Sequence, residues 1–147
     1  MNLSPNFTLH ELVHSNTADA KKIANTFDEK VVENLERLTK EILQPIRDEY
    51  GHSITINSAY RCSALNKAVG GSATSQHLTG EAVDISCSAT SKAELFRLIE
   101  KKIKDGKLKV GQLIWEYGSK AEPQWIHVSL PRTNGKPNNQ VLYLYSK

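Results

Sequence analysis

Apolar residues recur at helical spacing along one long segment of the chain. From Asp28 to about Tyr50 they fall three or four positions apart, at Val31, Leu35, Leu38 and Ile42. This spacing predicts an amphipathic helix with one buried face. Pro45 lacks the amide hydrogen that a helix interior requires, so we expect it to kink or divide this helix near its end.

Two further helices are predicted from capping patterns. Ser91 followed by Glu94 matches a capping box and opens a helix through about Lys104. Thr8 followed by Glu11 matches the same box within TLHELV. This helix should be short, because the residues that follow, SNTADA, are poor helix formers.

Five shorter segments alternate between apolar and polar residues, as strands with one buried face do. In the segment 52–61, Ile54 and Ile56 lie on one face. In the segment 81–86, Val83 and Ile85 face the core and Asp84 faces the opposite way. The other three strands are predicted at QLIWEY, WIHVSL and VLYLY, residues 112–117, 125–130 and 141–145.

Residues 64–80 separate the first two strands and are rich in Gly, Ser and Thr. They show no sustained period after Val69, so most of the segment is expected to be a long ordered loop, a feature that usually carries function. The order of elements predicts an α+β fold, with a small antiparallel sheet that has helices on one face. Because no linker or repeat interrupts the chain, residues 1–147 are expected to form a single domain.

Composition excludes several classes of protein. The net charge of +3 is mild, and Lys and Arg are scattered among acids, so no nucleic-acid binding is expected. No apolar run approaches the roughly 18 residues of a membrane span, and no export signal is recognised, so we expect synthesis in the cytoplasm, no stable membrane association and a monomer. Cys62 and Cys87 lack metal-binding spacing and are expected to be free thiols.

The five histidines allow two rival zinc sites. The first is HELVH, residues 10–14, which fits the HExxH pattern of zinc proteases. It would combine His10 and His14 with a distant acid such as Glu33 or Glu36, and Glu11 would be the base. Against this site, the helix is short and lies near a chain end, and capping already accounts for Glu11.

The second site combines His77 in the polar loop with Asp84 and His127 on strands. Each of these residues lies on the polar face of its segment, so the three could converge above one sheet and hold a zinc ion. Taken singly, each has a structural explanation: Asp84 could cap a loop, and His127 could be a hydrogen-bonded core histidine.

SQHLTGEAVD matches the pattern SxHxxGxAxD. Together with SAYRC, LNKAVGG, QLIWE and WIHVS, it resembles the zinc D-Ala-D-Ala carboxypeptidases, the vancomycin-resistance D,D-dipeptidases and the phage L-alanyl-D-glutamate endolysins. The hedgehog signalling domain shares their fold. The resemblance covers roughly residues 30–130, and the opening NFTLHEL is similar to the start of phage and prophage members.

The resemblance implies a single zinc peptidase domain of hedgehog-like fold. It implies that His77, Asp84 and His127 hold one zinc ion, with water in the fourth position. It also implies that Arg61 binds the substrate or stabilises the oxyanion, and that Ser75 hydrogen-bonds the substrate or steadies the zinc loop.

The sequence leaves three possibilities for the catalytic base. Many relatives carry a glutamate three residues before the last histidine ligand, but this chain has Gln124 there, and glutamine cannot accept the proton. Glu116 is the first candidate, because it shares a strand face with Gln112 and Ile114. Glu122 is the second, and a chain without a competent base is the third.

These features predict a zinc-dependent peptidase that cuts the peptide part of bacterial peptidoglycan, at a D-Ala-D-Ala end or an L-Ala-D-Glu bond. A phage or prophage lytic enzyme, released through a membrane lesion or carried by the virion, would reach that substrate. The alternative is a catalytically impaired, zinc-containing module that binds peptide or cell wall.

Overall fold

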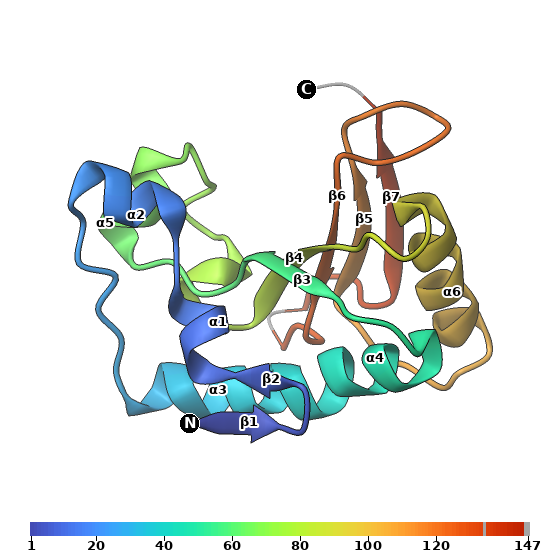
Figure 1. Ribbon diagram of the computed structural model, residues 1–147, viewed down its shortest axis with the longest axis horizontal. Helices are drawn as coiled ribbons and strands as arrows, with labels where there is room; N and C mark the ends of the chain where they lie inside the picture. The colour runs from blue at the N-terminus through green and yellow to red at the C-terminus, as the bar shows by residue number, and fades with distance from the viewer. Residues whose placement is uncertain (134, 146–147) are drawn as a thin grey trace.

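A five-stranded sheet forms the centre of the computed structural model, which describes residues 1–133 and 135–145 (Figure 1). The strand order is β3-β4-β6-β5-β7. The strands are β3 (Thr55–Ser58), β4 (Ala82–Ser86), β5 (Gln112–Glu116), β6 (Trp125–Ser129) and β7 (Gln140–Leu144). Each falls on a segment that the alternating pattern predicted, and with the helices around them the predicted α+β class is confirmed.

The sheet is mixed, which differs from the expected antiparallel arrangement. β3, β4, β6 and β5 pair antiparallel in turn, whereas β7 pairs parallel with β5. The reason lies in the last residues before β7, which lie beside the beginning of β5. There Asn139 N donates to Val110 O (2.7 Å) and Gln140 N donates to Gly111 O (3.1 Å). β7 therefore starts at the same end of the sheet as β5 and runs in the same direction.

The long helix predicted near residues 28–50 is present, and it is divided as the proline suggested. Its parts are α3 (Glu29–Leu38), the π-helical turn η1 (Thr39–Leu43) and α4 (Gln44–Tyr50). Asp28 caps the start by accepting from Val31 N. Pro45, in the first turn of α4, offers no amide to the carbonyls of the preceding turn. A π turn just before it accommodates this missing hydrogen bond within one continuous helix.

The core lies between the sheet and the helices on one of its faces. α6 (Lys92–Lys104) contacts β5 and β6, and α4 contacts α6. In Figure 1, α6 flanks the sheet while α3 and α4 run in line along the lower edge. The buried cluster joins the helices to the inward residues of β4, β5 and β6, namely Leu35, Leu38, Ile42, Ile46, Phe96, Ile99, Val83, Ile85, Leu113, Trp115, Ile126 and Val128. The opposite face of these strands carries Asp84, Gln112, Glu116 and His127, together with the apolar side chains of Ile114 and Trp125.

The N-terminal segment packs on the long helix. It comprises the two-stranded sheet of β1 (Asn2–Ser4) and β2 (Phe7–Thr8), followed by α1 (Leu9–Val13) and α2 (Asn16–Lys21). The predicted capping box is confirmed: Thr8 Oγ1 accepts from Glu11 N (3.2 Å), and the Glu11 carboxylate accepts from Thr8 N (3.0 Å). Glu11 is therefore used in starting a helix.

The segment 64–80 is more ordered than expected. Its first part belongs to α5 (Ser63–Ala68), and its last part forms the short 3-10 helix η2 (Gln76–Thr79). The sequence did not indicate α5, because six residues are too few to show a period. Asn66 ties α5 to the loop by donating from Nδ2 to Ser72 O (2.9 Å). Only the residues between these two helices therefore form the loop.

The thiols of Cys62 and Cys87 are free and partly buried, as predicted. No helix within residues 1–133 and 135–145 is long and apolar enough to cross a membrane.

Gly80 ends η2 in a left-handed conformation (φ +78°), and a Cβ there would lie 3.1 Å from Leu35 Cγ. We expect Gly80→Ala to lower the free energy of unfolding by more than Gly51→Ala. Gly51 has nearly the same φ (+76°) with open space around it, so its substitution costs about 1–2 kcal/mol of backbone strain alone. Urea denaturation of both variants measures the difference, and equal losses would mean that Gly80 is not held against α3.

Candidate metal centre

The strand register places two acid–base residues side by side on the polar face of the sheet. β4 and β6 pair antiparallel with Asp84 directly opposite His127. Their neighbours Val83, Ile85, Ile126 and Val128 point into the core and are fully buried. Because side chains alternate along a strand, Asp84 and His127 must then share the opposite face.

His77 reaches the same place from η2. The Ser75 hydroxyl caps this turn by accepting from His77 N (3.1 Å), and Arg61 N donates to His77 O (3.0 Å). The imidazole is 3% exposed, and its Nδ1 lies 2.5 Å from Ala59 O. A carbonyl only accepts, so Nδ1 carries the proton and Nε2 presents a lone pair. Such a backbone contact is the usual way in which proteins orient a metal-binding histidine.

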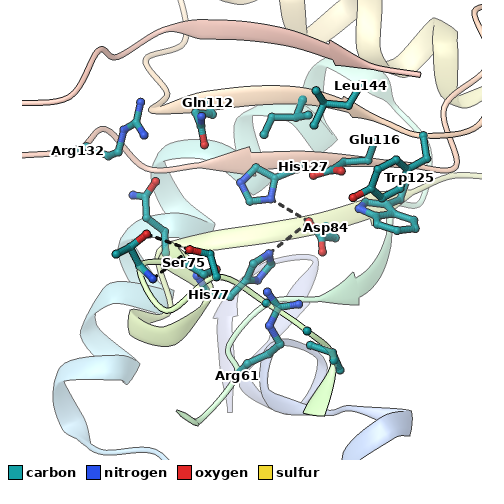
Figure 2. Close-up of a pocket in the computed structure, with 18 of the residues that line it drawn as sticks. Arg61, Ser75, His77, Asp84, Gln112, Glu116, Trp125, His127, Arg132 and Leu144 are labelled. Carbon is teal, nitrogen blue, oxygen red and sulfur yellow. Dashed lines mark hydrogen bonds and ion pairs between the residues drawn. The ribbon is translucent and has the colours of Figure 1, made fainter. Parts of the chain in front are cut away.

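The three side chains meet at one oxygen (Figure 2). His77 Nε2 lies 3.3 Å and His127 Nδ1 lies 3.0 Å from Asp84 Oδ1. One ligand atom from each residue lies within 4.8 Å of the other two. A tetrahedral zinc ion with bonds of about 2.0–2.2 Å holds its ligands roughly 3.3–3.5 Å apart. Two nitrogens and one carboxylate oxygen at this spacing fit zinc.

The electrostatics of this His–Asp–His group favour an ionised carboxylate. Burial raises the pKa of Asp84, but when the imidazoles are protonated in the metal-free protein, the charge of His77 and the hydrogen bonds from His127 and His77 outweigh burial. The pKa of this carboxyl therefore lies well below its ordinary value. Asp84 stays charged over the whole physiological range, as a metal ligand must.

The group lies in a cavity of about 600 Å³. Glu116, Gln112 and Ile114 line it from β5, as their shared strand face predicted. Trp125 lines it from β6, and Arg61 lies below His77 in Figure 2. The cavity is large enough for several residues of a peptide, and its polar wall is next to the His–Asp–His group.

Glu116 and Glu122, the two candidate bases, differ sharply in position. Glu116 is partly buried in the cavity wall; burial raises its pKa, His127 lowers it and Asp84 raises it, with a net increase. Glu122 does not line the cavity. It accepts from Lys92 N (2.8 Å) at the start of α6, and this bond and the charge of Lys92 lower its pKa. A base must reach the substrate, so the geometry favours Glu116.

These opposite shifts predict an observable order of protonation. As pH falls, Glu116 should take up its proton at a higher pH than Glu122, because the pKa of Glu116 is raised and that of Glu122 is lowered. Carbon-13 chemical shifts of the two side-chain carboxyls in the zinc-free protein measure this order. The reverse order would place Glu116 outside the partly buried wall.

Arg61 follows β3 and lines the cavity close to Asp84. Burial lowers the pKa of its guanidinium, and the nearby Asp84 carboxylate raises it. The Nε atom is buried and lacks a hydrogen-bond partner. Ser75 also lines the cavity, and its hydroxyl is engaged in holding His77. Ser75 was expected either to bind the substrate or to steady the loop that carries His77, and this hydrogen bond supports the second role.

The HELVH segment does not assemble a comparable group. His14 Nε2 contacts Asp19 (3.1 Å), on the next helix. Glu33 and Glu36, its suggested third ligands, pair with lysines on the surface of the long helix. In the described part of the chain, the His–Asp–His group is the set of three side chains that could hold a metal ion.

Trp125, Arg132 and Leu144 are among the cavity residues that were not predicted from sequence to have a role there. Trp125 stands two positions before His127 on the same strand, so its place on the cavity face could have been anticipated. Arg132 follows the same strand closely, but it lies beyond the strand, where alternation no longer orients a side chain. Leu144 reaches the cavity because β7 lies beside β5, a strand order that the sequence did not indicate.

A comparison with known families gives a match that covers most of the chain. A family model described as Peptidase M15 matches residues 5–129, which include all three members of the His–Asp–His group. A comparison with curated proteins found no match.

Proposed function

The chain belongs to the Peptidase M15 family of zinc metallopeptidases, and from this premise we propose that it hydrolyses peptide bonds in bacterial peptidoglycan. The zinc ligands in this proposal are His77, Asp84 and His127. The observation that supports them most strongly is the convergence of their three ligand atoms in the wall of a cavity that also contains a partly buried carboxylate.

Each residue of the site has a task that its position supports. Zinc, when bound, supplies a Lewis acid that lowers the pKa of water and polarises a carbonyl. Glu116 accepts the proton of the attacking water and delivers it to the leaving amine. Arg61 pairs with a substrate carboxylate or with the negative charge that develops on the carbonyl oxygen. Ser75 keeps His77 in place through the η2 cap.

Gln124 bears on whether the site is catalytic. It occupies the position at which many relatives carry a glutamate, and its side chain is exposed. Its backbone N donates to Glu116 O (2.9 Å), so Gln124, which directly precedes β6, lies beside the end of β5. We propose that Glu116 performs the proton transfer from β5 in place of a glutamate at position 124. If it does not, the chain is a zinc-containing module that binds peptide without cutting it.

We also propose that the enzyme acts in lysis by a phage or prophage. Support for this comes from the resemblance of the opening NFTLHEL to phage members. The cell wall is then reached after release through a membrane lesion or from the virion.

Mass spectrometry of digested peptidoglycan tests the proposed activity. Free D-alanine is expected from a D-Ala-D-Ala carboxypeptidase, and stem peptides that begin with glutamate are expected from an L-Ala-D-Glu endopeptidase. Zinc-loaded protein that releases neither product while still binding peptidoglycan would support the binding module.

A further inference from the structure

Arg132 lies in the cavity wall on the segment that crosses from β6 to β7. Its backbone N donates to Asn138 Oδ1 (2.7 Å), and its Nη2 donates to Pro137 O (2.5 Å) and Gln140 Oε1 (3.3 Å). Gln140 Oε1 also accepts from Gln112 Nε2 (3.1 Å), on β5. These neutral partners fix the guanidinium in place without compensating its charge.

No carboxylate within the described ranges forms an ion pair with Arg132. Glu81 lines a smaller hollow beside the cavity together with Arg132, but its carboxylate accepts from Thr79 Oγ1 (2.5 Å). The Nε atom of Arg132 is buried and has no hydrogen-bond partner. A fixed, partly buried cation without a counterion favours the binding of an anion, and the planar guanidinium matches a carboxylate.

The two ends of the cavity differ in chemistry. Figure 2 shows Arg132 on one side of His127, with Glu116, Trp125 and Leu144 on the other. The end next to Glu116 is therefore lined by apolar side chains, and the end at Arg132 is cationic. A peptide that spans the cavity can place a small apolar residue at the first end and an acidic group at the second.

We propose that Arg132 is a specificity-determining residue that binds a carboxylate of the peptide substrate away from the scissile bond. This inference rests on the proposed function and narrows its substrate class. The protein should therefore prefer stem peptides in which the glutamate has a free carboxylate over stem peptides in which that carboxylate is replaced by a carboxamide.

Two synthetic stem peptides that differ by this carboxylate or carboxamide test the inference. They are compared on the zinc-loaded wild-type protein and on Arg132→Gln and Arg132→Lys. Arg37→Gln is the control, because Arg37 is exposed on α3, pairs with Glu41 (3.4 Å) and does not line the cavity. Arg37→Gln removes the same positive charge at a position outside the cavity.

The wild-type and Arg37→Gln proteins should prefer the carboxylate peptide by about tenfold or more in kcat/KM, mainly through KM. Arg132→Gln should lose this preference by cleaving the carboxylate peptide less efficiently, while it still cleaves the carboxamide peptide, which also shows that it is folded. Arg132→Lys, which keeps the charge, should retain part of the preference. An undiminished preference in Arg132→Gln, or none in the wild-type protein, would overturn the inference.

Calorimetric binding of the same peptides separates this inference from the proposed hydrolysis. It is measured on zinc-loaded Glu116→Gln protein with and without Arg132→Gln. An Arg132-dependent preference in binding supports the subsite even if the wild-type protein cleaves neither peptide, a result that would refute the hydrolysis alone. Equal binding of both peptides by the Glu116→Gln protein refutes the subsite, whatever the activity.

Discussion

Glu116→Gln is expected to lower kcat by about 10²–10⁴-fold and to leave one zinc ion bound. The substitution keeps the shape of the side chain and removes its capacity to accept a proton. Glu116 is not a member of the His–Asp–His group, so metal binding should persist. Steady-state kinetics on peptidoglycan fragments measure the loss, and metal analysis of the same sample measures the zinc.

Glu122→Gln is the matched control for this experiment. Glu122 lies outside the cavity and bonds to the start of α6. Its replacement should lower the thermal midpoint slightly and leave kcat unchanged. A large fall in kcat for Glu122→Gln, together with undiminished turnover by Glu116→Gln, would exchange the two assignments.

Asp84→Ala is expected to remove stoichiometric zinc and to reduce hydrolysis to the uncatalysed level. Asp84 Oδ1 lies within 3.3 Å of both imidazole nitrogens, so its loss leaves two ligands without the central anion. Two neutral histidines alone hold zinc weakly, because catalytic sites need about three protein ligands. Metal analysis after gel filtration measures the bound zinc.

The double variant His10→Ala/His14→Ala is the control for metal loss. It removes two imidazoles from the HELVH segment while the His–Asp–His group is untouched. Retained zinc and activity are expected, since His14 contacts the exposed Asp19 and neither residue belongs to the group of three side chains that could hold a metal ion. Loss of zinc in this variant, with retention in Asp84→Ala, would transfer the site to the N-terminal helix.

The alternating pattern predicted much of the candidate site. It placed Asp84 and His127 on the polar faces of their strands, because Val83, Ile85, Ile126 and Val128 had to be buried. It could not reveal that β4 and β6 are neighbours with Asp84 opposite His127, since pairing register depends on contacts between distant segments. The position of His77 also required the structure, because a loop residue has no period to orient it.

The parts that sequence did not predict depend on the path of the chain. Residues 135–139 lead into β7 beside the beginning of β5, which makes β7 parallel to β5, and Arg132 lies in the cavity wall. No local pattern in PRTNGKPNNQ specifies that path. HELVH shows the opposite problem, a pattern that matches a zinc motif locally while its glutamate completes a helix cap.

We propose that two imidazoles and one carboxylate from η2, β4 and β6 hold a single zinc ion. Anomalous diffraction at the zinc absorption edge, from crystals of the zinc-loaded protein, measures the position of the ion. One peak per chain is expected, within bonding distance of His77 Nε2, Asp84 Oδ1 and His127 Nδ1. A peak at His10 and His14, or none near Asp84 in a sample that contains one zinc per chain, would contradict it.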